Sequence, residues 1–152
     1  MIASLLTEIE ALAASGNWGG ALAAVITFFQ ADSGTIHVMG PDGHLHLQCA
    51  SAGIPQPVLD IVRVVPVGKG MAGLAAERGA PVTICNIQTD TSGDVRPGAR
   101  ATGLEGAIAL PMLAGAGRVA GVLGVANRRE RTFTADETEQ LLAVGRTLAR
   151  YA

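Results

Sequence analysis

The feature that most restricts the possible folds is a long apolar segment in the C-terminal third of the chain. Residues 107–126 are apolar over about the length of a membrane-spanning helix. The segment is interrupted, however, by Pro111, by Arg118 and by the turn-forming run Ala-Gly-Ala-Gly at 114–117. Two strands joined by a turn fit this pattern better than one spanning helix. We therefore predict a β-hairpin of residues 107–113 and 119–126.

A second hairpin is predicted around the turn Gly40-Pro41-Asp42-Gly43, which separates strand-like runs at 35–39 and 44–49. Simple pairing across this turn places five apolar residues on one face: Ile36, Val38, Leu45, Leu47 and Cys49. The opposite face then carries Thr35, His37, Met39, His44, His46 and Gln48. Three histidines on one face could bind a metal ion, form ordinary polar surface or line a pocket.

The remaining patterns predict helices at both ends of the chain and shorter elements between them. Helices are expected over residues 2–14, 17–29, 58–62 and 71–78, and short strands over 63–67 and 82–84. A long loop follows from 86 to 105, and such loops in compact domains are usually functional. The last helix begins with Thr134 and Glu137 in the spacing of a capping box.

Composition excludes several classes of protein. With 49% hydrophobic and 16% charged residues, the 152-residue chain can bury a core and is not of the disordered type. A formal net charge of −2 and the lack of a basic run argue against nucleic-acid binding. Two cysteines, Cys49 and Cys85, are too few for a disulfide framework and favour a reducing cytoplasm. No linker or repeat is visible, so we predict one domain over 1–152.

A glycine-rich turn carries the clearest functional motif. Gly68, Gly70 and Gly73 match the dinucleotide-binding pattern G-x-G-x-x-G, with Asp90 near the distance of a ribose-binding acid. The motif lies in mid-chain after an antiparallel hairpin, however, and Pro66 precedes it, unlike a buried parallel strand. A Rossmann site is therefore disfavoured. The turn either binds an anion through the amides of residues 71–73 or serves only as a tight turn.

The order of motifs along nearly the whole chain resembles the GAF family of sensory domains. The resemblance rests on several weak motifs in sequence order: residues 32–36, 45–53, 67–76, 79–82, Asn86, Asp90, 106–111, 121–127 and 133–137. It implies an α/β fold of the α+β type, GAF/PAS-like, with a central antiparallel sheet of about five or six strands. Terminal helices are expected on one face and a ligand pocket under short helices and loops on the other.

The resemblance also implies candidate ligand-binding residues around that pocket. They are Gly70, Met71, Ala72, Gly73, Cys85, Ile87, Asp90, Asp94, Arg100, Ala107 and Ala109. Arg96 belongs to the same charged loop, whose side chains either contact a ligand or are solvated. Asn127, Phe133, Asp136 and Glu137 resemble a signature of nucleotide-binding GAF domains that acts mainly as structural support.

The expected function is that of a non-enzymatic, cytoplasmic sensory domain in signal transduction. Family members bind cyclic nucleotides, tetrapyrroles or small metabolites, and many dimerise through their terminal helices, so a homodimer and a separate output protein are expected. No particular cofactor is implied, and no catalytic or metal-binding residue, nucleic-acid partner or membrane partner is expected. Two alternatives remain: a free methionine-sulfoxide-reductase-like enzyme using Cys85, or a dimerisation module without ligand.

Overall fold

The computed structural model describes residues 1–152, except for the side chain of Pro97. It contains a six-stranded sheet in the order β3-β2-β1-β6-β5-β4, in which all neighbouring strands are antiparallel. The strands are β1 (Ser33–Met39), β2 (His44–Ala50), β3 (Val64–Pro66), β4 (Val82–Ile84), β5 (Ala107–Leu113) and β6 (Val119–Ala126). The apolar segment thus forms the predicted β5–β6 hairpin, and no described helix has the length and apolarity to cross a membrane.

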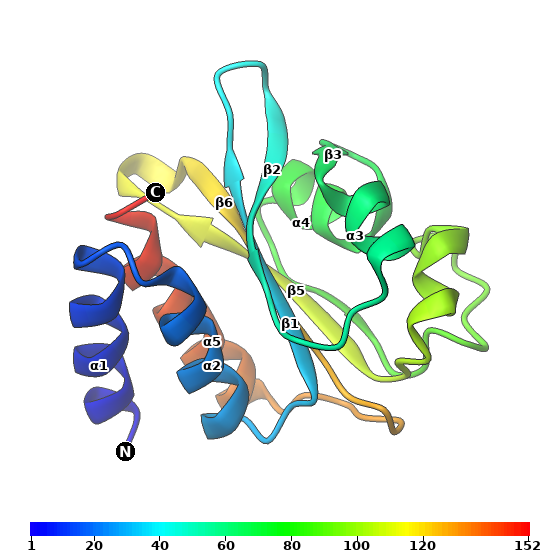
Figure 1. The fold of residues 1–152 in the computed structure, drawn as a ribbon, viewed down its shortest axis with the longest axis horizontal. Helices are drawn as coiled ribbons and strands as arrows, with labels where there is room; N and C mark the ends of the chain where they lie inside the picture. Colours follow the sequence, from blue (N-terminus) through cyan, green and yellow to red (C-terminus); the bar gives the residue numbers. More distant parts are fainter.

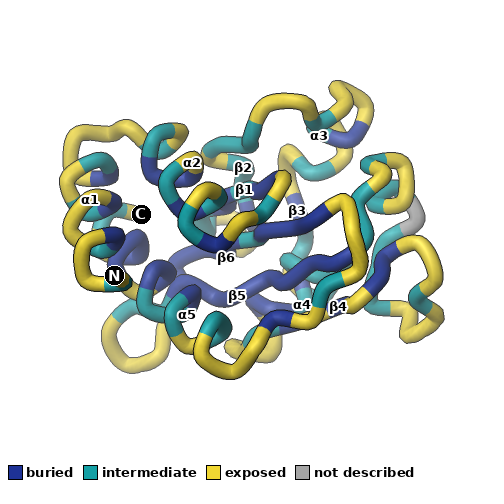
Figure 2. The backbone as a smooth tube through the Cα atoms, turned by 90° about the horizontal axis from the view of Figure 1, so that it is seen from below, coloured by how far each residue is buried: buried dark blue, intermediate teal, exposed yellow. Residues whose placement is uncertain are grey.

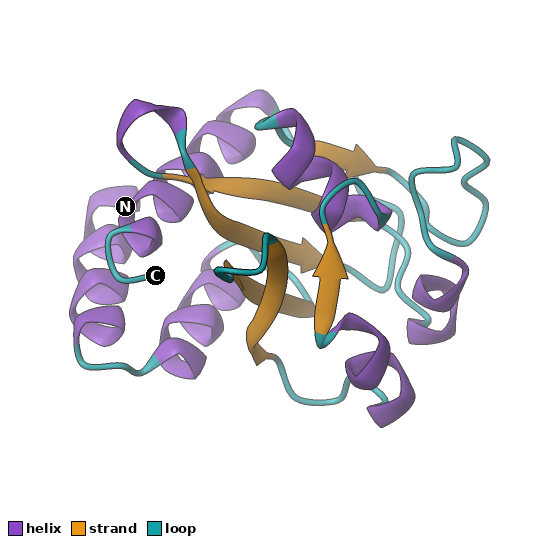
Figure 3. Ribbon diagram, turned by 90° about the horizontal axis from the view of Figure 1, so that it is seen from above, coloured by secondary structure: helices purple, strands orange, loops and turns teal.

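Helices cover both faces of the sheet (Figures 1 and 3). One face carries α1 (Ile2–Ala14), α2 (Trp18–Phe28) and α5 (Ala135–Ala149). The other carries α3 (Gln56–Val62), α4 (Gly70–Arg78) and the 3₁₀ helix η1 (Pro97–Thr102). A second 3₁₀ turn, η2 (Gly115–Gly117), joins β5 to β6. This arrangement confirms the predicted fold class, with terminal helices on one face and short helices on the other.

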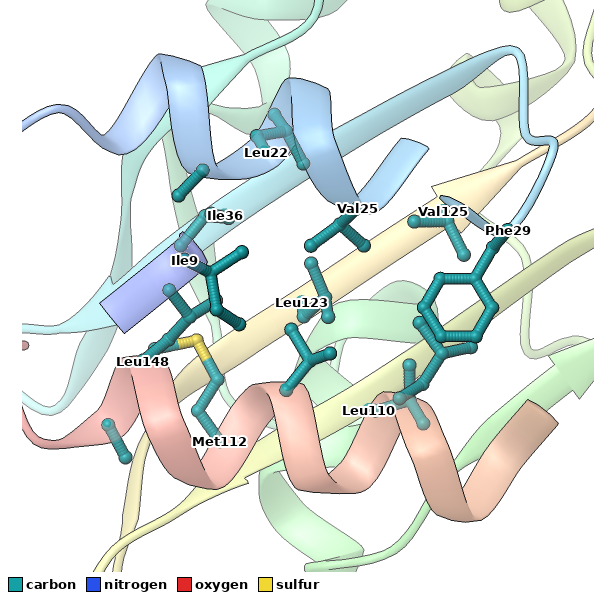
Figure 4. Packing of buried hydrophobic residues seen from close by; sticks show 14 of the residues in the cluster. Ile9, Leu22, Val25, Phe29, Ile36, Leu110, Met112, Leu123, Val125 and Leu148 are labelled. Carbon is teal, nitrogen blue, oxygen red and sulfur yellow. The ribbon is translucent and has the colours of Figure 1, made fainter. Parts of the chain in front are cut away.

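The main core lies between the sheet and the terminal helices (Figures 2 and 4). Ile9 of α1, Leu22 of α2 and Leu148 of α5 belong to the same buried cluster as Leu123 of β6 and Met112 of β5, and all five are essentially inaccessible. Burying each such side chain contributes roughly 1.5–3 kcal/mol of hydrophobic stabilisation. α2 and α5 therefore pack directly on the sheet, and α1 packs against α2 and α5.

The predicted faces of the β1–β2 hairpin are wrong because the strands pair one residue out of the predicted register next to the turn, where Met39 pairs with Leu45 and not with His44. Ile36 pairs with Cys49, but the next residue, His37, pairs with Leu47, so Gln48 is an extra residue in β2. The register next to the turn places Leu45 and Leu47 on the face of His37, and the bulge at Gln48 returns Cys49 to the face of Ile36.

The register next to the turn separates the three histidines. His37 lies on the face opposite His44 and His46, because the latter pair falls on the side of the sheet that carries Val38. Among the residues that the structure describes, no group of three histidine, cysteine or acidic side chains could hold a metal ion. The hypothesis of a three-histidine metal site on the hairpin is therefore wrong.

Candidate ligand pocket

A cavity of about 200 Å³ lies between the sheet and the layer formed by α3, α4 and η1. Its floor is built from β1, β5 and β6, including Thr35, His37, Ala107, Ala109, Gly124 and Ala126. Its opposite wall is built from the short helices, including Val58, Ile61, Val62, Gly70, Met71, Ala72, Gly98, Ala99 and Thr102. The cavity therefore occupies the face of the sheet where the resemblance placed a pocket.

Small residues on one face of the central strands leave the space for this cavity. Ala107 and Ala109 face it, whereas the alternate residues Ile108 and Leu110 of the same strand belong to the core under the terminal helices. Gly124 lies between Leu123 and Val125 of β6 in the same way. Large side chains fill one side of the sheet and small ones leave the other side open.

The glycine turn forms one end of the cavity. Gly68 and Gly70 both adopt left-handed backbone conformations, with φ of 92° and 67°. At Gly73 a Cβ would lie 2.5 Å from the carbonyl oxygen of Pro66, so only glycine lets α4 approach β3 this closely. The turn is thus required by the backbone, which supports the structural interpretation of the motif.

The same turn also leaves donors free at the start of α4. No side chain caps this helix, and the hydrogen bonds of the described residues include none from the N–H groups of Gly70, Met71 and Ala72. The first N–H groups of a helix lack intrahelical acceptors and lie at the positive end of its dipole. These three residues line the cavity. The geometry is therefore also compatible with anion binding at this end.

Two cationic residues, Lys69 and Arg96, line the cavity, and none of its described lining residues is acidic. Lys69 is exposed, whereas Arg96 is half-buried. The Arg96 stem lies on the turn, because a Cβ on Gly70 would lie 2.8 Å from its Cδ atom. Its Nη1 atom is buried and has no hydrogen-bond partner among the described residues.

His37 is the most deeply buried polar residue of the cavity wall, with only 2% of its surface exposed. Its Nε2 atom lies 2.8 Å from the carbonyl oxygen of Val62 in α3. Burial lowers the pKa of His37; the bond to Val62 opposes this shift, and His46 adds a small repulsion. A neutral imidazole must donate from Nε2 to a carbonyl, so Nδ1 is a free acceptor with no partner among the described residues.

The predicted site residues divide into two groups. Gly70, Met71, Ala72, Ala107 and Ala109 line the cavity, whereas Gly73, Cys85, Ile87, Asp90, Asp94 and Arg100 are not among its described lining residues. His37 was not among the predicted ligand-binding residues, although the sequence left open that its strand face lines a pocket. The α3 residues were missed because a short apolar helix has no distinctive signal of ligand binding.

Most loop charges shape the loop instead of facing the cavity. The Arg100 guanidinium donates to the carbonyl oxygens of Asp90, at 2.9 Å, and Ile87, at 3.4 Å. Asp94 lies 3.5 Å from Arg78 of α4 in an ion pair. Of the four loop charges considered, Arg96 is thus the one that reaches the cavity. The sequence has no signal that distinguishes Arg96 from Arg100.

Neither cysteine is among the described lining residues of the cavity. Cys85 is exposed just after β4. Cys49 is half-buried on β2, and burial raises the pKa of its thiol to about 11. A thiol with a raised pKa has little thiolate at neutral pH and is a poor nucleophile.

A buried polar network joins the end of β6 to the start of α5. Asn127 is 2% exposed and donates from Nδ2 to the carbonyl oxygen of Gln30, at 2.9 Å. Arg131 donates to Asn127 Oδ1, at 2.8 Å, and to the carboxylate of Glu137, at 2.6 Å. Its guanidinium also lies 4.2 Å from the centre of the Phe133 ring. The Asn-Phe-Glu signature therefore supports the structure and does not line the cavity.

Comparison with known proteins identifies the family. A model of the GAF domain matches residues 20–151, and the chain belongs to the GAF domain family. No curated protein sequence matches the chain. The assignment of all 152 residues to one domain remains a prediction.

Several solved structures share the fold. A free methionine-R-sulfoxide reductase from Neisseria meningitidis, in complex with its substrate, is 18% identical with a TM-score of 0.78, covering 99% of this chain and 87% of that one. The GAF domain of a phosphoenolpyruvate-protein phosphotransferase from Acinetobacter is 16% identical with a TM-score of 0.77, covering 99% and 92%. A putative GAF sensor protein from Burkholderia vietnamiensis is 18% identical with a TM-score of 0.77, covering 99% and 92%. At these identities the likeness establishes the fold alone.

Proposed function

We propose that this GAF domain is a sensory module that binds a small molecule in the cavity between the sheet and α3, α4 and η1. The observation that carries the proposal is a mainly apolar cavity whose floor is kept open by small residues and whose lining contains buried polar atoms without partners among the described residues. Ligand sites typically combine apolar walls with a few convergent polar groups. An unoccupied structural gap would be expected to lack such groups.

Occupancy would be transmitted through the loop that lines the cavity. The Ile87 N–H donates to the Glu105 carbonyl, and the Glu105 N–H donates to the Asn127 carbonyl. Asn86 Nδ2 also lies 2.9 Å from Glu130. These bonds connect the loop to residues 127–131, from which Arg131 reaches Glu137 at the start of α5. A ligand that orders the loop would therefore bias the packing of α5.

The terminal helices would pass the signal on. We expect the domain to form a homodimer through α1, α2 and α5, or to act on a separate output protein in signal transduction. Its two free cysteines suit a reducing compartment such as the cytoplasm. The ligand class in this proposal includes small metabolites and cyclic nucleotides.

Native mass spectrometry of the purified protein tests the proposal, because it reports retained ligand and oligomeric state together. Thermal-shift measurements with a panel of metabolites and nucleotides should give at least one stabilising compound. Ala109→Leu, which places a larger side chain on the cavity floor, should abolish that shift, whereas Ala80→Leu at an exposed position should not. A panel without any stabilising compound, together with no retained ligand, would overturn the sensing proposal.

The reductase alternative has weaker support. Its basis is likeness to reductase folds, but Cys85 is outside the described cavity lining and Cys49 has a raised pKa. We expect purified protein to show no Cys85-dependent turnover of free methionine sulfoxide. Turnover that is lost in Cys85→Ser would establish the enzyme and contradict the non-enzymatic proposal.

A further inference from the structure

Two buried side-chain nitrogens lack a hydrogen-bond partner in the described part of the chain: Arg96 Nη1 and His37 Nδ1. Both residues line the same cavity. Leaving a buried polar group unpaired costs free energy, so nearly all such groups in native proteins have a partner. The coincidence of both orphans in one mainly apolar cavity indicates that a ligand supplies the missing partners.

The charge of the cavity wall specifies one part of that ligand. Arg96 and Lys69 are both cationic, and the described lining contains no carboxylate to neutralise them. The Arg96 stem lies against Gly70, where the free N–H groups of Gly70, Met71 and Ala72 begin the nine-residue helix α4. A guanidinium, an ammonium and the positive end of a helix dipole thus border the same cavity. Together they favour an anionic group.

His37 specifies a second part. Its Nε2–H is used by the Val62 carbonyl, so the free Nδ1 atom can only accept a hydrogen bond. The group that completes the site must therefore carry an N–H or O–H donor. A simple inorganic anion such as chloride has no such donor.

The remaining wall is mainly apolar, with Val58, Ile61, Val65 and Leu104 among its side chains. The cavity volume of about 200 Å³ lies below the range of roughly 300–1,000 Å³ that is typical of drug-sized ligands. The ligand body is accordingly small and mainly hydrocarbon.

Building on the proposed function, we propose that the ligand is a small organic acid with a mainly apolar body. Its acidic group binds Arg96, Lys69 and the first amides of α4, and a hydroxyl or amino group of the same molecule donates to His37 Nδ1. This assignment makes Arg96 the main determinant of charge selectivity and His37 a second determinant of specificity.

A matched set of small probes tests the proposal directly. Isocaproate, isocaproamide and isohexylamine share one branched skeleton and differ in charge, and leucate adds an α-hydroxyl to isocaproate. Binding to the protein, freed of any retained ligand, is measured by ligand-observed NMR, with the Ala109→Leu variant as the reference for binding outside the cavity. We expect leucate to bind best, isocaproate next, and the amide and amine at least about tenfold more weakly.

Two substitutions at Arg96 separate charge from packing. Arg96→Met keeps an apolar stem on Gly70 and should remove the preference for acids, whereas Arg96→Lys should retain part of it. Arg118→Gln, in the exposed turn at the far end of the β5–β6 hairpin, serves as the control and should leave the preference unchanged. His37→Phe should remove only the advantage of leucate over isocaproate.

Thermal stability without ligand gives a second readout that a merely structural arginine would not produce. Because one buried nitrogen of Arg96 has no partner among the described residues, Arg96→Met should leave the melting temperature without ligand unchanged or raise it. A fall in melting temperature together with unchanged acid preference would assign Arg96 a structural role and overturn the inference.

The outcomes also distinguish this inference from the function on which it rests. Equal binding of amide, amine and acid in the cavity would refute the organic-acid assignment and leave a ligand-binding domain. Failure of all four probes to bind, combined with no response to the wider metabolite panel, would overturn both proposals.

Discussion

At the scale of single residues, an unpaired buried nitrogen distinguishes His37, which we propose binds ligand, from the structural residue Asn127. Asn127 is as deeply buried as His37, but Asn127 bonds to Gln30 and Arg131, whereas His37 has one free ring nitrogen among the described residues. A satisfied buried group stabilises and orients its neighbours. A buried group with an unpaired polar atom destabilises the fold, and a ligand that supplies the missing hydrogen bond can offset that cost.

Burial of His37 predicts a pH dependence of stability. Its pKa in the folded protein lies below the ordinary value of 6.5, so the unfolded chain binds the proton more readily than the folded one. The free energy of unfolding therefore decreases as the pH falls below about 6.5. The nearby cavity residues Arg96 and Lys69, and His46 on β2, supply no negative charge to offset this effect.

Urea unfolding between roughly pH 8 and pH 5 measures this dependence. His37→Gln should reduce the loss of stability over that range, whereas His44→Gln on the exposed end of β2 should retain it. A wild-type slope that His37→Gln leaves intact would contradict the assignment of the effect to His37.

Gly73 provides a prediction from close backbone approach. An alanine Cβ at this position would meet the Pro66 carbonyl at 2.5 Å, so Gly73→Ala should destabilise the fold by about 2–3 kcal/mol. Gly19→Ala in α2, where nothing lies within 4 Å of the added Cβ, should be neutral or slightly stabilising. Denaturant unfolding of the two variants measures the difference; equal stabilities would contradict the tight α4–β3 contact.

At the scale of elements, the start of α5 is defined by local chemistry that the sequence displays. Thr134 accepts from the Glu137 N–H at 3.1 Å, and Glu137 accepts from the Thr134 N–H at 2.9 Å, confirming the predicted capping box. Burial alone would raise the pKa of Glu137, but bonds from Thr134 and Arg131 lower it below its usual value. The cap therefore also anchors the network that reaches the pocket loop.

Removal of the Thr134 cap should make the folded protein measurably less stable. Thr134→Ala should reduce the free energy of unfolding by about 0.5–2 kcal/mol, because it leaves the Glu137 N–H without its side-chain acceptor. Thr7→Ala in α1 is the matched control, since the Thr7 hydroxyl only bonds the Ala3 carbonyl within an already formed helix. Equal urea midpoints for both variants would show that the cap makes no measurable contribution to the free energy of unfolding.

At the scale of the whole molecule, the two faces of the sheet are packed differently. Large side chains such as Leu110, Leu123 and Leu148 fill the side under the terminal helices. The pocket side combines a cavity with a smaller buried cluster that includes Ala75 and Ala76 of α4. We therefore expect lower local stability on the pocket side of the sheet.

This difference predicts a gradient of local stability. Backbone amides of β1, β5 and β6 should exchange hydrogen only through opening at nearly the global free energy, whereas those of residues 88–104 should exchange much faster. Native-state hydrogen exchange measures both, and a ligand in the cavity should slow exchange in the loop more than in the sheet. Uniform protection of both regions would contradict the gradient.

The sequence by itself determined the elements and their order, because the signals involved are local. The hairpin turns, the helical pattern of residues 2–14 and the capping box at Thr134 act over a few residues, and the corresponding elements are present in the structure. The order of motifs was also sufficient to indicate the family.

Only the tertiary structure decided which side chains meet in the pocket. The packing of Ile36 under the terminal helices placed its neighbour His37 on the face of the short helices, and the fold of the 86–105 loop brought Arg96 to Gly70 while Arg100 bonded the loop itself. These choices depend on contacts between residues far apart in the chain, and a shift of one residue in strand pairing changes which side chains share a face without changing the composition. The sequence therefore indicated the face of the sheet that carries the cavity, and the packing decided which polar residues line it.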